Sequence, residues 1–226
     1  MNLARFTIVI LAILAVATLV QTALAQTTDQ VIITWEANNF YPANFLGKPL
    51  VTPGTPVTAL VEVVRGGKFL NISGSNIAWY LDDNFVSEGH GKKSVTFTAR
   101  QKDSGTHTIR AEIERAEGTL VTSLQIPITA PRVVIEAPYP NGIVQAQSDI
   151  FLKSIPYFFT NSSLNDLIFF WQINDTRQQS TGDNALSLKL GALQTSGQQT
   201  LRITGTVQNQ SNLAEFANGR AKLMVQ

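Results

Sequence analysis

Ile77-Ala78-Trp79-Tyr80-Leu81 and Phe169-Phe170-Trp171-Gln172-Ile173 share one pattern, a tryptophan with an apolar residue two positions away on either side. Residues two apart lie on the same face of a β-strand, so each pattern predicts a strand that buries its tryptophan. The same alternation recurs from Val57 to Val63, from Val95 to Phe97 and from Ile109 to Ile113. Turn-forming residues separate these runs, and no segment after residue 26 keeps a helical period. The sequence therefore predicts an all-β protein.

The two tryptophans mark the repeat of a whole domain. Trp79 and Trp171 are 92 positions apart. The same offset relates Asp83 to Asp175, Ser104 to Ser196, Gly105 to Gly197, Thr108 to Thr200 and Arg110 to Arg202. A period of this length indicates a duplicated domain rather than a solenoid unit. We predict one domain at residues 26–130 and a second at 131–226, joined near Thr129-Ala130-Pro131-Arg132.

The first copy is the longer one. Its first strand, Val31-Ile32-Ile33, and the corresponding Val133-Val134-Ile135 are 102 positions apart rather than 92. About ten extra residues therefore precede the first tryptophan strand. We expect them in the segment from Ala37 to Pro53.

These stretches resemble the immunoglobulin fold. The run Asp103-Ser104-Gly105-Thr106-His107-Thr108-Ile109 is similar to the start of strand F, and Ile77-Ala78-Trp79-Tyr80 is similar to strand C with its buried tryptophan. The resemblance puts Ile109 and Leu201 where the second cysteine of that fold stands. It puts His107 and Gln199 where the corner tyrosine of that fold stands.

The likeness is closest to the cysteine-free immunoglobulin-like and PKD-like domains of prokaryotic surface proteins, and it covers residues 27 to 226. It implies two tandem immunoglobulin-like β-sandwiches. This architecture serves adhesion, spacing, chaperoning and accessory roles alike, so it leaves the function open.

The first 25 residues have the features of a secretory signal peptide. Arg5 supplies a positive charge, the apolar run Phe6 to Val20 follows, and Ala23-Leu24-Ala25 precedes Gln26. The run of about 15 residues is shorter than the roughly 20 that span a bilayer. We expect cleavage before Gln26 and an extracytoplasmic protein, secreted or at the cell surface. The alternative is an uncleaved anchor, and only then would the chain be attached to a membrane.

Composition argues against several classes of function. The 17 basic and 16 acidic residues give a net charge of +1, whereas a nucleic-acid binder needs a concentrated basic face. The chain has no cysteine, which excludes disulfides, thiol catalysis and cysteine-based metal sites.

The sequence predicts no catalytic, metal-binding or cofactor-binding residues, and no enzyme. The two histidines are His90, between two glycines, and His107, which we expect to bond the backbone at the corner before strand F. Asp82-Asp83-Asn84 could bind calcium, but the same residues suit a tight hairpin turn, which we favour.

One stretch is a candidate for binding a partner. Asn38 to Leu46 lies within the extra segment and contains Phe40, Tyr41 and Phe45. These aromatics could anchor a protein partner, or they could cover the end of the sandwich or fill the domain interface. We expect a non-enzymatic secreted or cell-surface module that mediates protein contacts or acts as a spacer, with a protein partner at the cell envelope. The alternative is an accessory protein of an envelope assembly such as a pilus or secretion machine.

Overall fold

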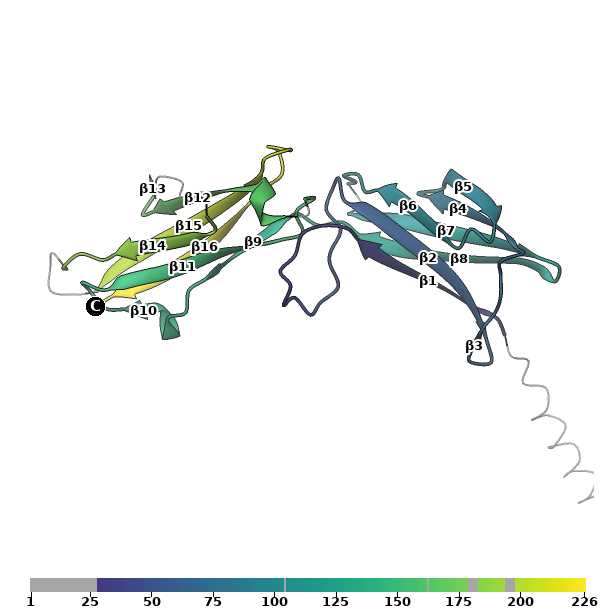
Figure 1. The fold of residues 1–226 in the computed structure, drawn as a ribbon, viewed down its shortest axis with the longest axis horizontal. Helices are drawn as coiled ribbons and strands as arrows, with labels where there is room; N and C mark the ends of the chain where they lie inside the picture. Colours follow the sequence, from purple (N-terminus) through teal and green to yellow (C-terminus); the bar gives the residue numbers. More distant parts are fainter. Residues whose placement is uncertain (1–27, 104, 162, 179–182, 194–197) are drawn as a thin grey trace, which may run out of the picture.

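The computed structural model describes residues 28–103, 105–161, 163–178, 183–193 and 198–226. These residues form two β-sandwiches that follow each other end to end (Figure 1). The predicted signal segment lies outside the described residues, as do Ser104 and Ser196-Gly197 of the repeat. Within the described ranges, no helix has the length and apolar character needed to cross a membrane.

The first sandwich contains two antiparallel sheets. In one, β2 (Pro56–Arg65) pairs with β1 (Gln30–Ala37), β3 (Lys68–Phe69) and β6 (Ser94–Thr98). The other has the order β5 (Asn84–His90), β4 (Asn76–Leu81), β7 (Thr106–Arg115) and β8 (Gly118–Pro127). In immunoglobulin notation, the first of these sheets holds strands A, B and E, and the second holds strands C′, C, F and G.

The second sandwich repeats this plan. One sheet has the order β14 (Ala185–Lys189), β11 (Asp149–Tyr157) and β9 (Arg132–Glu136). The other has the order β10 (Ile143–Val144), β16 (Phe216–Val225), β15 (Gln199–Asn209), β12 (Leu167–Ile173) and β13 (Thr176–Arg177). Only β10 pairs in parallel in these two sheets, with β16. Two short 3-10 turns, Pro140–Gly142 and Leu164–Asp166, precede β10 and β12.

The alternating residues form the cores, as predicted. Trp79 on β4 and Trp171 on β12 are both fully buried, in equivalent positions of the two sandwiches. The indole N–H of Trp79 donates to the carbonyl oxygen of Lys92 at 2.9 Å. Most other predicted core positions of the first sandwich are also buried: Val57, Ala59, Val61, Val63, Ile77, Val95, Phe97, Ile109, Ala111 and Ile113. Leu81, at the end of β4, is only partly buried.

The repeat offset does not extend to strand F. Leu81 pairs with Ile109, whereas the equivalent Ile173 pairs with Ile203. Ile203 therefore takes the place of Ile109, and the expectation that Leu201 does so is wrong by two residues. For the same reason Leu201, rather than the expected Gln199, takes the place of His107. A shift of two residues keeps the same side chains facing inward, so Leu201 is still buried.

The extra residues of the first copy lie where they were expected. Residues 38–50 connect β1 to Val51, which forms a parallel bridge with Ile128 after β8. In the second sandwich β10 makes the equivalent parallel pairing, and only residues 137–142 separate it from β9. The first sandwich therefore has a long loop at the end that faces the second.

Candidate functional site

The loop at residues 38–50 reaches across to the second sandwich. The backbone N–H of Phe40 donates to the carbonyl oxygen of Phe159 at 2.7 Å. The N–H of Phe158 donates to the carbonyl oxygen of Phe40 at 2.6 Å. Together they form an antiparallel bridge between residues of different sandwiches.

A second link comes from the residues that follow the loop. Thr52 is fully buried, and its hydroxyl donates to the carbonyl oxygen of Phe158 at 2.8 Å. The hydroxyl of Thr55 lies 2.8 Å from that of Thr52 and also accepts the backbone N–H of Thr52. Both backbone groups of Phe158 are therefore bonded to the first sandwich.

Phe158 has an unusual backbone conformation. Its φ is +64°, in the left-handed region that residues with a large side chain seldom adopt. Such a conformation costs about 1 to 3 kcal/mol and persists only where neighbouring contacts hold it. Here the contacts come from Phe40 and Thr52 across the junction.

Aromatic rings surround these hydrogen bonds. Phe45 contacts Tyr157 and Phe158 edge to face, with ring centroids 5.7 and 5.6 Å apart. Tyr41 contacts Phe45 in the same way at 5.9 Å. Phe40 packs against a buried cluster of the second sandwich that includes Phe159. The loop and the second sandwich thus share a small apolar core of their own.

The three aromatics predicted to bind a partner therefore lie together. Phe40 and Phe45 face the second sandwich, as the interface alternative expects. Tyr41 keeps 40% of its surface exposed, and Leu46 at the loop tip is completely exposed. Binding of a partner by these aromatics stays a prediction. Sequence reasoning missed Thr52 and Phe158, because a positive φ at phenylalanine has no sequence signal.

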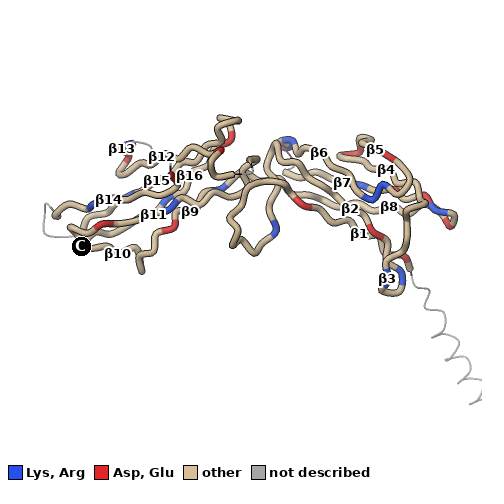
Figure 2. The backbone as a smooth tube through the Cα atoms, in the orientation of Figure 1, with Lys and Arg blue, Asp and Glu red and all other residues tan. Residues whose placement is uncertain are grey.

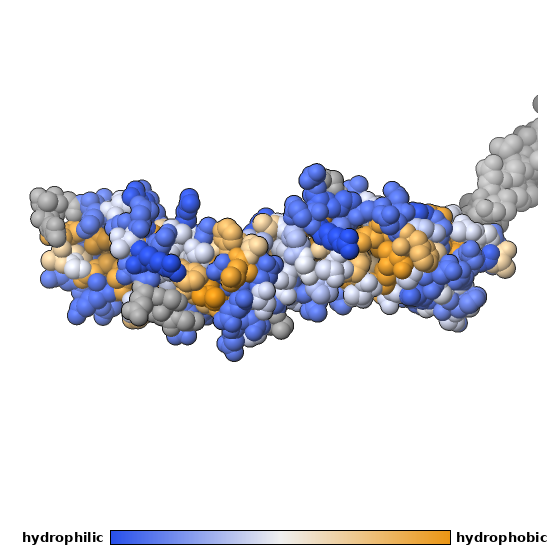
Figure 3. Space-filling model, turned by 90° about the horizontal axis from the view of Figure 1, so that it is seen from above, coloured by the Kyte–Doolittle hydropathy of each residue, from blue (hydrophilic) through white to orange (hydrophobic). Residues whose placement is uncertain are grey.

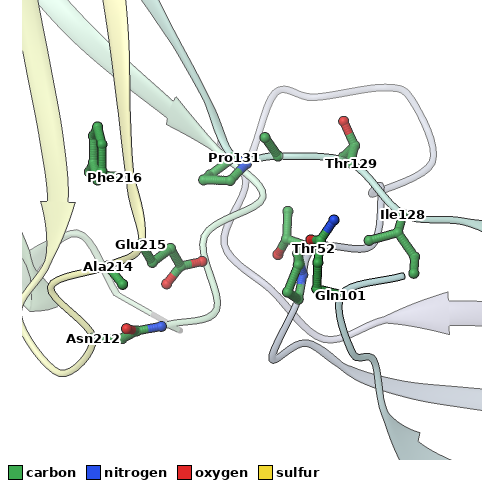
Figure 4. Close-up of a pocket in the computed structure, with 11 residues that line it drawn as sticks. Thr52, Gln101, Ile128, Thr129, Pro131, Asn212, Ala214, Glu215 and Phe216 are labelled. Atoms are coloured by element: carbon green, nitrogen blue, oxygen red, sulfur yellow. The ribbon is translucent and has the colours of Figure 1, made fainter. Parts of the chain in front are cut away.

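A hollow of about 450 Å³ lies on another side of the junction. Figure 4 shows Thr52 and Gln101 of the first sandwich opposite Asn212 and Glu215 of the second. Glu215 is buried, and its carboxylate accepts three hydrogen bonds, from the N–H and hydroxyl of Thr160 and from the amide of Asn209. These bonds tie two loops of the second sandwich together, so this carboxylate has a structural role.

The surface around the junction is mixed in character. Seen from above, hydrophobic surface occurs in separate areas over the two sandwiches, with hydrophilic surface between them (Figure 3).

His107 has the predicted structural role. Its Nε2 accepts the backbone N–H of Arg100 at 3.0 Å, at the corner before β7. The sequence did not predict its second partner, Asp82, whose Oδ2 lies 2.6 Å from Nδ1. Burial opposes ionisation of Asp82, but hydrogen bonds from Lys102, the N–H of Thr108 and His107 outweigh it and lower the pKa of the carboxyl.

The Asp and Asn residues after the tryptophan strands form hairpin turns. Asp82 and Asp83 have φ of 51° and 64°, and Asn174 and Asp175 have φ of 47° and 68°. Two successive residues of positive φ between paired strands are typical of a type I′ hairpin. Within the described ranges, no group of three or more His, Asp or Glu side chains could hold a metal ion.

No family model matches the chain, and no curated protein matches its sequence. Several solved structures of tandem domains match the chain with low scores. The three N-terminal domains of the Hoc protein of bacteriophage RB49 are 13% identical, with a TM-score of 0.46, and the match covers 88% of this chain and 59% of that one. The present chain therefore spans about three fifths of that structure.

Two further structures have lower scores. The fibronectin(III)-like modules of Clostridium thermocellum CbhA are 11% identical over 86% of this chain and 93% of that one, with a TM-score of 0.30. Murine CEACAM1b is 14% identical, and the match covers 86% of this chain and 100% of that one, with a TM-score of 0.30. From its own strand order and pairing, the chain is an all-β protein of two tandem immunoglobulin-like sandwiches.

Proposed function

We propose that the chain is a non-enzymatic, extracytoplasmic spacer whose two sandwiches are held in one relative orientation. Phe158 carries the proposal, because its strained backbone is fixed by hydrogen bonds from the other sandwich. Domains joined in tandem move relative to one another unless a substantial contact prevents it. A loop that adds backbone pairing and aromatic packing across the junction is such a contact.

The short connection between the domains supports the same function. Ile128 is bridged to Val51, and Arg132 already begins β9, so few residues remain to act as a hinge. Pro131 stiffens them further. An elongated pair of sandwiches (Figure 1) with a braced junction can hold two attached components at a fixed separation.

The loop tip gives the spacer a place to contact a protein partner. Leu46 is fully exposed and Tyr41 partly so, while Phe40 and Phe45 are packed at the base of the loop. An exposed apolar tip on a loop whose base is fixed loses little conformational entropy on binding.

Small-angle X-ray scattering tests the spacer role. The scattering of the wild-type protein should be fitted by one elongated shape. A variant that lacks Asn39 to Gly47, with the gap closed by a short Gly-Ser linker, should require a range of bent shapes while each sandwich stays folded. Identical scattering from both proteins would contradict the proposal.

A separate variant tests the partner contact. Tyr41→Ser with Leu46→Ser alters only the tip, so the scattering should match wild type while retention of envelope proteins falls. Unchanged retention would show that the tip binds no partner and would leave the spacer role intact.

A further inference from the structure

The outer face of the five-stranded sheet in the second sandwich carries four cations. Arg202 on β15 lies directly opposite Lys222 on β16, and Arg220 lies opposite Thr204 on the same pair of strands. Arg177 on β13 is the fourth, with its guanidinium 4.5 Å from the centre of the Phe170 ring. Figure 2, in which Lys and Arg are blue, shows basic residues in this part of the second sandwich.

The fold does not require these charges. Like charges directly opposite each other on neighbouring strands destabilise a sheet. In the first sandwich, strand pairing puts Thr108 and Gln125 where Arg202 and Lys222 stand, and Ser123 where Arg220 stands. The first copy therefore builds the same sheet with neutral residues at these three positions.

The cations of the second sandwich are also poorly neutralised. Asp175 approaches Arg202 at 3.5 Å, but its side chain is 87% exposed. Arg220 and Lys222 have no carboxylate partner among the described residues. In the first sandwich, by contrast, Arg110 pairs with Glu112 on the equivalent face.

Arg202, Arg220 and Lys222 line a hollow of about 570 Å³. The rest of its lining consists of one carboxylate, four neutral hydrogen-bonding side chains and two apolar residues, namely Asp175, Gln172, Thr204, Thr206, Asn218, Ile203 and Ala221. Phe170 lies outside this lining, with its ring against the guanidinium of Arg177.

We propose that this hollow binds an acidic polysaccharide through Arg202, Arg220 and Lys222. Guanidinium and ammonium groups complement the sugar carboxylates, and the hydroxyl and amide side chains match the sugar hydroxyls. A protein partner would be expected to meet an exposed aromatic anchor. The lining contains no aromatic residue, and its apolar residues are Ile203, which is buried, and Ala221. The ligand is therefore a hydrophilic polymer with repeated negative charge.

Binding to polygalacturonate tests the proposal, measured with the complete chain at several salt concentrations. Wild-type protein should bind, and binding should weaken as salt rises, because bound cations displace counterions from the polymer. Arg220→Ser with Lys222→Gln installs the residues of the first sandwich. This change should lower the affinity at least about tenfold and make the salt dependence shallower.

The matched control is Lys153→Ser with Lys189→Ser. It removes the same net charge from the other sheet of the same sandwich, since these lysines lie on β11 and β14. The control should bind polygalacturonate like wild type. Equal losses from both double variants would indicate nonspecific charge attraction and overturn the proposal.

Two further polymers define the ligand class. Neutral dextran should not bind. Polyglutamate, which has the charge without the sugar hydroxyls, should bind more weakly than polygalacturonate. Equal or tighter binding of polyglutamate would overturn the assignment to a polysaccharide and indicate an acidic polypeptide instead. Because none of these residues lies in the junction loop, failure here leaves the spacer role untouched.

Discussion

Phe40 and Phe159 belong to different sandwiches, yet their backbones pair as neighbours in an antiparallel sheet. The pairing continues into Phe158, whose N–H donates to the carbonyl oxygen of Phe40. The junction is therefore built from the same kind of hydrogen bond as the sandwiches themselves.

Thr52→Val should weaken the junction without disturbing either core. Valine keeps the shape of threonine but removes the donor to the buried carbonyl oxygen of Phe158. An unsatisfied buried group costs about 1 to 3 kcal/mol, so chemical denaturation should show a loss of that size. Thr58→Val, which removes an exposed hydroxyl bonded to Thr96, is the control and should change little.

Trp79→Ala and Trp171→Ala should each destabilise one sandwich by about 3 to 5 kcal/mol, because each leaves a cavity in a separate core. Calorimetry should show that each variant lowers the unfolding temperature of a different sandwich. Trp35→Ala serves as the comparison, since Trp35 is only partly buried, and it should have a smaller effect. Equal losses from all three would contradict the assignment of the cores.

Asp82→Asn should lower stability in a pH-dependent way. The pKa of Asp82 is lower in the folded protein than its ordinary value of 3.8, so the carboxylate stabilises the fold above that value. The contribution disappears as the pH falls through the lowered pKa. The free energies of unfolding of wild type and variant should therefore differ at neutral pH and become equal in acid. Asn tolerates the positive φ here, as Asn174 does in the second copy, so the turn should survive.

The N-terminal sequence leads to a prediction that mass spectrometry can check. Protein from the native host should begin at Gln26, after the Ala23-Leu24-Ala25 site. A chain that still begins at Met1 and sediments with membranes would favour the uncleaved anchor.

Much of the fold could be predicted because alternation and turn chemistry are local. The buried tryptophans and the paired Asp and Asn turns followed from residues near one another in sequence. The position of the extra loop followed from comparing the two copies of the repeat. Strand register is not local, and the identity of Arg110 and Arg202 concealed a shift of two residues in strand F.

The candidate sites were harder to predict for the same reason. Packing of Phe45 on Phe158 depends on how two domains meet, which the sequence of neither domain contains. The balanced total charge likewise concealed Arg202 opposite Lys222, because composition averages over the whole surface.

The distribution of distances between the two sandwiches tests the central claim most directly. The chain has no cysteine, so Thr96→Cys on β6 and Ser187→Cys on β14 can each carry one spin label at an exposed position. Electron–electron double resonance should give one narrow distance distribution for this protein, and a broad one after deletion of Asn39 to Gly47. A distribution that is equally broad with and without the loop would contradict the account.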